Sequence, residues 1–236
     1  MKNRFLLLGV LVLICFVTAC GNKVSSDSSK FKEEYEALNG QEIGNSGLKY
    51  REVEINEENP FVYKTASDII KMMERKESFV VYFGFSNCPW CRSVIETLIS
   101  VAKDNGLEKI YYVDVKDIRD TMTIDESGNI VTSKKGSDDY YKLLTLLDSV
   151  LDDYTLTNKD GESISAGEKR IFAPNVVSVV GGEAKELETG ISDLQTDAFM
   201  VLTEEMINET YNKFKCSIKC VLENKNTCSS EAQKAC

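Results

Sequence analysis

Two cysteines with two residues between them carry the clearest chemistry in this sequence. Cys88 and Cys91 enclose Pro89 and Trp90, and together they form a Cys-Pro-Trp-Cys motif. On the first turn of a helix, cysteines at this spacing can close a local disulfide while their sulfurs keep different surroundings. The first sulfur lies near unpaired backbone N–H groups and the positive end of the helix dipole, which favour the thiolate. Cys88 is therefore the expected nucleophile, and Cys91 the thiol that resolves a mixed disulfide.

The two residues between the cysteines fit the same role. Pro89 suits the first helical position because its missing N–H group would have no partner there. Trp90 offers aromatic surface that can bind a client protein. Zinc knuckles and structural bridges share the same spacing, so the alternative is a Cys88–Cys91 disulfide that never exchanges.

A buried strand and an amphipathic helix are expected to position the pair. The run FVVYFGF at 79–85 is almost continuously apolar, which predicts a central strand covered on both faces. After the motif, apolar residues recur at the spacing of one buried helical stripe, namely Cys91, Val94, Ile95, Leu98, Ile99 and Ala102. A second inner strand at 109–115 completes a β-α-β unit, whose two strands run parallel.

Further elements are expected around this unit, because alternation, capping residues and turn residues mark their positions. They are an edge strand at 50–55, a helix beginning at Thr65 or Ser67, a helix from Ser137 to Tyr154, a strand at 170–182 with 183–188 returning as an antiparallel edge, and a last helix that begins at Ser192 or, for its strong part, at Thr203.

In this order of elements the chain resembles the thioredoxin superfamily over residues 50–215. The resemblance implies a three-layer α/β/α sandwich with a mixed central sheet and an inserted helix before the cis-proline strand. It also implies that Ala173-Pro174 is the cis-proline position, where both residues hold the client chain beside the cysteines. Among subgroups, the chain is most similar to extracytoplasmic thioredoxin-like proteins that accompany bacteriocin maturation, which share an FYFG-type strand before a Cys-Pro-aromatic-Cys motif.

Two positions near the motif bear on its chemistry. Tyr82 stands six residues before Cys88, where many thioredoxins carry a buried acid, so proton transfer to Cys91 must use water or another group. Arg92 is the only cation immediately beside the motif. We therefore expect an intermediate reduction potential rather than a strongly oxidising one.

Four further cysteines lie near the C-terminus and predict a helical extension at 216–236 that is held by disulfides. Four cysteines permit three pairings, and we favour nested bridges between Cys220 and Cys228 and between Cys216 and Cys236. A four-cysteine zinc site is the alternative, but exported proteins oxidise such thiols and the two-residue knuckle spacing is missing.

The N-terminus reads as a lipoprotein signal. Lys2 and Arg4 precede an apolar run that ends in Val-Thr-Ala-Cys, which resembles a bacterial lipobox. Residues 1–19 are then the signal peptide, and Cys20 becomes the lipidated residue that anchors the protein at the outer face of the cytoplasmic membrane. The polar segment 20–47, with one weak helical turn around residues 31–38, is expected to be a flexible tether, and the thioredoxin-like domain is expected at 48–215.

Composition excludes several classes of function. The 236 residues contain no histidine, so Ser-His-Asp and Cys-His nucleophiles and His-ligated metal sites are excluded. The net charge of −10 argues against nucleic acid as a partner, because phosphate binding needs clustered cations. The sequence also has no glycine loop for phosphate and no carboxylate cluster for metal, so no cofactor is expected.

Together these features predict a membrane-anchored thiol-disulfide oxidoreductase that acts on cysteines of exported proteins or peptides. A membrane redox partner is implied, because the pair must be restored after each exchange. Oxidase, isomerase and reductase share one site, so the direction stays open. The alternative is a surface lipoprotein that binds a partner through a thioredoxin fold with a static Cys88–Cys91 bridge.

Overall fold

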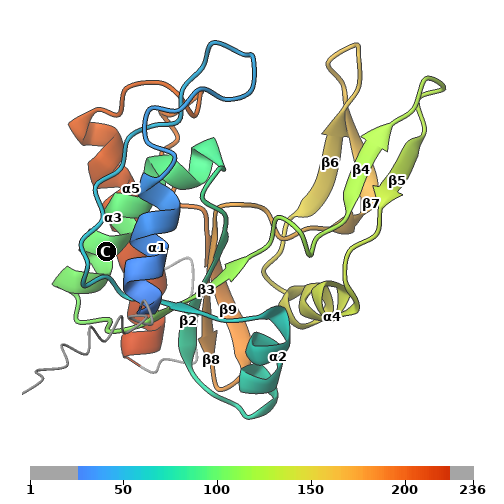
Figure 1. Ribbon diagram of the computed structural model, residues 1–236. Coiled ribbons are helices and arrows are strands. Elements are labelled where there is room, and N and C mark those ends of the chain that lie inside the picture. The colour runs from blue at the N-terminus through green and yellow to red at the C-terminus, as the bar shows by residue number, and fades with distance from the viewer. Residues whose placement is uncertain (1–25, 224–236) are drawn as a thin grey trace, which may run out of the picture.

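A five-stranded mixed sheet forms the centre of the computed structural model, which describes residues 26–223 (Figure 1). β1 and β2 run parallel to β3, and β8 runs antiparallel to β2 and β9. The expected mixed α/β fold with a mixed sheet is confirmed, and the apolar run at 79–85 supplies its middle strand. The order across the sheet is β1 (Phe61–Tyr63), β3 (Ile110–Asp114), β2 (Phe79–Gly84), β8 (Asn175–Val180) and β9 (Glu183–Glu188).

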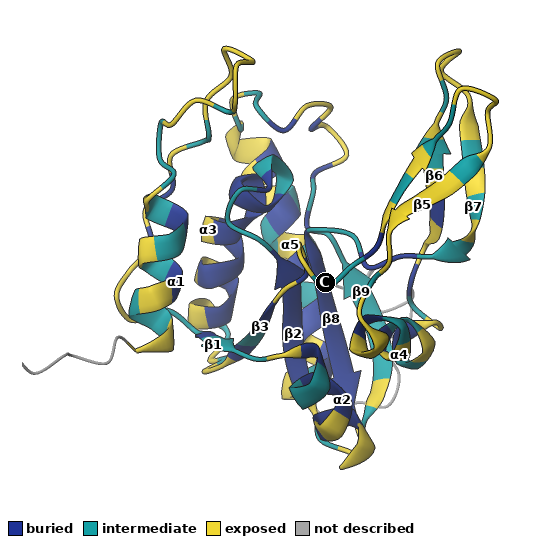
Figure 2. Cartoon of the chain, turned by 45° about the vertical axis from the view of Figure 1, so that its right-hand side comes forward, coloured by how far each residue is buried: buried dark blue, intermediate teal, exposed yellow. Residues whose placement is uncertain are grey.

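Helices cover both faces of this sheet. Every residue of β2 and of β8 is buried, as the dark blue strands of Figure 2 show. Along β2, Val80 and Tyr82 enter one hydrophobic core, while Val81 and Phe83 enter the other. This alternation follows from the two-residue period of a strand. The first core is covered by α1 (Asp27–Glu36), α3 (Pro89–Asp104) and α5 (Glu204–Leu222), the second by α2 (Ala66–Glu74) and α4 (Asp138–Leu147).

The polar residues expected to start helices do so. Thr65 caps α2 in a reciprocal arrangement with Asp68, and Ser137 and Thr203 cap α4 and α5. The expected extension of α4 to Tyr154 was wrong, because the helix ends at Leu147 and Tyr154 belongs to a strand. The acidic residues after Leu147 disfavour further helix, since they lie at the negative end of its dipole.

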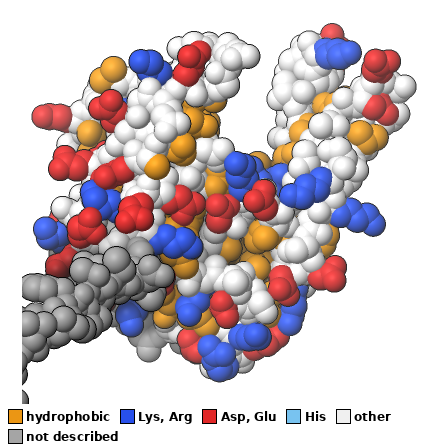
Figure 3. All heavy atoms as spheres, viewed as in Figure 1, with side chains coloured by type: hydrophobic (Ala, Val, Ile, Leu, Met, Phe, Trp, Pro, Cys, Tyr) orange, Lys and Arg blue, Asp and Glu red, His pale blue; other side chains and the backbone are white. Residues whose placement is uncertain are grey.

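Two hairpins form an arm that the sequence did not predict. They are β4 (Thr121–Ile124) with β5 (Ile130–Lys134), and β6 (Asp153–Thr157) with β7 (Ser163–Lys169). They lie side by side in Figures 1 and 2, and a hollow separates them from the rest of the molecule in Figure 3. Their turns at 125–129 and 158–161 were recognised, but the strands are short and largely exposed, so they lack the apolar alternation of a covered sheet.

The structure differs from the predicted tether, because α1 occupies part of it. Phe31 and Tyr35 are 0% exposed, and the Phe31 ring stacks on Phe61 with centroids 3.9 Å apart. The folded domain therefore includes described residues well before 48. The sequence indicates only a weak helical turn here, because just two aromatic residues at i and i+4 form the buried stripe of α1 among charged and serine residues.

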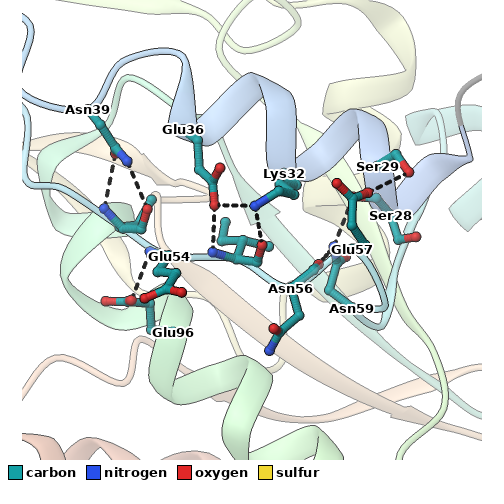
Figure 4. A network of polar contacts seen from close by, with 12 residues as sticks. Ser28, Ser29, Lys32, Glu36, Asn39, Glu54, Asn56, Glu57, Asn59 and Glu96 are labelled. Carbon is teal, nitrogen blue, oxygen red and sulfur yellow. Dashed lines mark hydrogen bonds and ion pairs between the residues drawn. The ribbon is translucent and has the colours of Figure 1, made fainter.

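The segment predicted as an edge strand at 50–55 belongs to no sheet. Val53 and Ile55 are buried as expected, but side chains of other segments satisfy their backbone (Figure 4). Val53 N–H donates to Asn39 Oδ1 at 3.0 Å, and Ile55 N–H donates to Glu36 Oε1 at 2.8 Å. Alternation predicts an extended segment with one buried face, whereas it does not identify the hydrogen-bond partners.

Replacing Phe31 with alanine should lower the free energy of unfolding by about 3–5 kcal/mol, since it empties a fully buried aromatic site. Denaturant titration of the full chain measures this change. Leu48→Ala is the control, because Leu48 is 46% exposed, and we expect it to change stability by no more than about 0.5 kcal/mol. Equal stability of the two variants would mean that residues 26–47 are a tether after all.

Candidate active site

The two cysteines meet at the first turn of α3. Cys88 is the N-cap, Pro89 is the first helical residue, and the Cys91 N–H donates to Cys88 Sγ at 3.3 Å. Cys91 is 0% exposed and Cys88 only 5% exposed. The apolar stripe of α3 packs in the first core and carries Cys91 beneath the helix start, so Cys88 is the sulfur nearer to solvent.

The surroundings shift the two thiols in opposite directions. A hydrogen bond with the Cys91 side chain lowers the pKa of Cys88, against the effect of burial. The backbone N–H groups of Cys91 and Trp90 and the charge of Arg119 lower it further. Burial raises the pKa of Cys91 well above its usual value, and the neighbouring Cys88 raises it again. A reactive thiolate beside a thiol that stays protonated is the arrangement a nucleophile and a resolving cysteine need.

The Ala173–Pro174 segment lies against the nucleophile. β8 pairs with β2 so that Asn175 faces Phe83, which brings the preceding two residues beside the loop that leads to Cys88. The Ala173–Pro174 peptide bond is cis, and Cys88 Sγ donates to the Ala173 carbonyl oxygen at 3.3 Å. The structure thus brings Ala173 and Pro174, two of the proposed client contacts, beside the proposed nucleophile Cys88.

Trp90 is half-buried rather than freely exposed. Its side chain packs against the first core, and its carbonyl oxygen accepts a hydrogen bond from Ser93 Oγ at 2.8 Å. Pro89 is also half-buried. Both residues remain at the helix start beside Cys88, with part of each surface open to solvent.

Arg92 does not serve the cysteines. It is 1% exposed, and Nε donates to Arg51 O at 2.7 Å while Nη1 donates to Tyr35 O at 2.8 Å. The guanidinium therefore ties the N-terminal segment to α3. Arg92 is next to the motif in the sequence, but in the folded site its guanidinium is not beside the sulfurs. Its position on the helix directs the side chain away from them.

Arg119 is the cation that acts on Cys88, and sequence reasoning missed it. It follows the end of β3, and its guanidinium carbon lies 5.0 Å from the centroid of the Phe85 ring. Phe85 precedes the cysteine loop, and its carbonyl oxygen accepts a hydrogen bond from Cys88 N–H at 3.1 Å. The sequence does hold a signal for Arg119: it follows the strand that neighbours β2, and residues after neighbouring parallel strands meet at the same edge of a sheet.

Two of the other cysteines lie in a different helix from this pair. Cys216 and Cys220 belong to α5, which runs without a break across the expected boundary at 216, and Cys220 is 7% exposed. Cys20, Cys228 and Cys236 lie outside the described residues. Within residues 26–223, no group of three or more Cys, Asp, Glu or His side chains is placed to hold a metal ion.

No protein-family model and no curated protein matches this chain. The interpretation of the site therefore depends on its geometry and chemistry.

Removing the charge of Arg119 should raise the pKa of the Cys88 thiol, because one interaction that favours the thiolate is lost. The rate of iodoacetamide alkylation of the reduced chain, followed against pH, reports this pKa. The alkylation rate rises with pH as the Cys88 thiol loses its proton, and the midpoint of this rise should move to higher pH in Arg119→Gln. The variant should therefore react more slowly than the unmodified chain in mild acid, and at the same rate at a pH above the midpoints of both proteins.

Lys116→Gln is the matched control, since Lys116 is an exposed cation in the same loop. Its midpoint should stay unchanged. An unchanged midpoint in Arg119→Gln would mean that Arg119 does not act on Cys88.

Proposed function

We propose that this protein is a thiol-disulfide oxidoreductase with a thioredoxin-like fold, in which Cys88 is the nucleophile and Cys91 the resolving thiol. The observation that carries the proposal is the geometry of the pair, in which Cys88 caps α3 and accepts the Cys91 N–H at 3.3 Å while Cys91 is 0% exposed beneath it. The opposite directions in which these surroundings shift the two thiol pKa values agree with it. The contact between Cys88 Sγ and the Ala173 carbonyl oxygen supports it, and so does the position of the motif after the central strand of a mixed sheet.

The reaction is an exchange of disulfides in two steps. The Cys88 thiolate attacks one sulfur of a client disulfide, and the other client sulfur leaves with the bonding electrons and takes a proton. Cys91 then loses its proton and attacks Cys88 Sγ, which releases the second client thiol. The client has gained two electrons, and the pair has become a disulfide. Run backwards, the same steps oxidise a client.

The client binds beside the helix start, in this proposal, with its chain next to Trp90, Ala173 and Pro174. The hairpin arm joins the sheet at the same end, since its two hairpins follow β3 and precede β8. A client at Cys88 would therefore meet the arm on one side. We propose cysteine-containing exported proteins or peptides as clients, because the lipobox-like sequence that ends at Cys20 would direct the chain to a compartment where disulfides persist.

Lipidation at Cys20 would hold this site at the outer face of the cytoplasmic membrane, where a membrane redox partner restores the pair. Among the described residues, no helix has the length and apolar character needed to cross a membrane. Cleavage and acylation are tested by mass spectrometry of the chain isolated from membranes, since both change the mass of the N-terminal peptide.

Replacing Cys91 with alanine should make the full chain accumulate mixed disulfides through Cys88, because attack proceeds and resolution does not. Non-reducing electrophoresis detects these adducts, and mass spectrometry identifies the peptide that contains Cys88. Cys88→Ser and the double variant are matched controls that should form none. If partner capture is the same in all three variants, the protein is a binding module with a static bridge.

The direction of electron transfer follows from the reduction potential of the pair. We expect a value between about −120 mV, typical of a strong oxidase, and about −270 mV, typical of a reductase. Thiolate stabilisation by one cation and the helix start favours the reduced form, but the burial of Cys88 opposes it. Equilibration against glutathione, with the Cys88/Cys91 couple followed by mass, gives the potential. A value outside this range would mean that thiolate stabilisation and the burial of Cys88 do not offset each other.

A further inference from the structure

A buried tyrosine lies beneath the redox pair with its hydroxyl against Cys91. Tyr82 is in the central strand β2 and is 0% exposed. Its hydroxyl forms a hydrogen bond with the Cys91 side chain, and it lies 3.1 Å from the hydroxyl of Tyr35. Tyr35 comes from α1 and is also 0% exposed. Three elements thus contribute one continuous chain of polar groups, which runs from Tyr35 through Tyr82 to the Cys91 sulfur.

Gly84 provides the space that this arrangement needs. A Cβ atom at Gly84 would lie 2.4 Å from the Tyr82 hydroxyl oxygen and 2.4 Å from the ring carbon that bears it. The Tyr82 ring therefore lies over Gly84 and points along the strand toward the cysteine loop. Any larger residue would push the hydroxyl away from Cys91. The sequence pattern Tyr-x-Gly before the motif is what allows the contact.

Both tyrosine hydroxyls keep their protons, so the Tyr82 hydroxyl can donate a hydrogen bond to sulfur but cannot act as a base for the thiol proton. Burial raises the pKa of both Tyr35 and Tyr82 well above the usual value, so neither loses its proton where a thiol titrates. Each hydroxyl has one hydrogen. When Tyr35 donates to the Tyr82 oxygen, the Tyr82 hydrogen is left for Cys91. A hydrogen bond to a charged acceptor in such a dry site is stronger than one to a neutral acceptor.

We propose that Tyr82 is a catalytic residue of the resolving step, where its hydroxyl donates a hydrogen bond to the Cys91 sulfur as that sulfur becomes a thiolate. This inference depends on the proposed oxidoreductase function. During the step, the Cys91 S–H bond breaks and its sulfur attacks Cys88 Sγ. The client sulfur leaves with the electron pair of the mixed disulfide and receives the proton. The Tyr82 O–H bond stays intact, and Tyr35 is a positioning residue that holds this hydroxyl.

Other groups also act on the Cys91 sulfur. The Phe85 N–H group also donates to the Cys91 sulfur, and the Cys88 side chain forms a hydrogen bond with it. Tyr112 and Arg119 interact with it electrostatically from β3 and from the loop after β3. Of these, Tyr112 gives the best control. Its ring stacks on Tyr82 with centroids 5.7 Å apart, and within the described part of the chain its buried hydroxyl has no hydrogen-bond partner.

Reaction of the reduced full chain with dithiobis-nitrobenzoate separates the two steps. Attack by Cys88 releases one thionitrobenzoate, and resolution by Cys91 releases the second, so stopped-flow absorbance records both rates. Subtracting the trace of Cys88→Ser removes release from the other cysteines. In Tyr82→Phe the second release should slow about tenfold, which corresponds to about 1.4 kcal/mol, while the first stays unchanged. The pH midpoint of the second release should also move upward.

Tyr35→Phe should slow the second release by about threefold, a smaller effect because it weakens the donor indirectly. Tyr112→Phe should leave both releases unchanged. A second release in Tyr82→Phe as fast as in the unmodified chain would overturn the inference, and so would equal slowing in Tyr112→Phe. If Tyr82→Phe does not fold, Tyr35→Phe decides, since an unchanged rate there also overturns it. Absence of any release above the Cys88→Ser trace in the unmodified chain would instead refute the proposed function.

Discussion

The burial of Cys91 is the constraint on which the rest of the site depends. Because its sulfur shares the apolar stripe of α3 with Val94, Ile95 and Leu98, the helix can pack in only one rotation over the sheet. That rotation places Cys88 at the N-cap, beside the backbone N–H groups of the first turn. It also directs Arg92 away from the sulfurs and toward the N-terminal segment. One buried thiol thereby determines which cysteine is reactive and which neighbouring cation is structural.

Helix α1 helps to exclude water from the side of Cys91 that faces the core. Tyr35 closes the site from behind, and Phe31 fixes the helix against Phe61 of the sheet edge. The same helix supplies Glu36, which accepts the Ile55 N–H in place of a neighbouring strand. These contacts make the N-terminal segment part of the site rather than a spacer before it. A dry environment strengthens each hydrogen bond to a charged sulfur, which is what the proposed resolving step needs at Cys91.

The centre of the molecule could be read from the sequence, and its periphery could not. An all-apolar strand at 79–85, a helical stripe that includes Cys91 and the capping residues Thr65 and Ser137 are local signals with a direct physical cause. Such signals end where partners come from distant segments. Alternation around Val53 could not reveal that side chains rather than a strand satisfy its backbone. The hairpins of the arm were not predicted, because largely exposed strands show little apolar alternation. At the site, the cysteines were evident, but Arg119 depends on the meeting of two strand ends.

The attachment of the arm explains why a charge is available at Cys88. Asp120 and Arg170, at the bases of the two hairpins, form a buried ion pair with an oxygen to nitrogen distance of 2.5 Å. Arg170 also lies over the Tyr154 ring, 4.2 Å from its centroid. A buried pair of this kind adds little net stability, because the cost of desolvation opposes the attraction between its charges. Asp120 neutralises Arg170, whereas Arg119 forms no ion pair within residues 26–223. Arg119, which directly precedes Asp120 in the chain, therefore keeps a charge that favours the Cys88 thiolate.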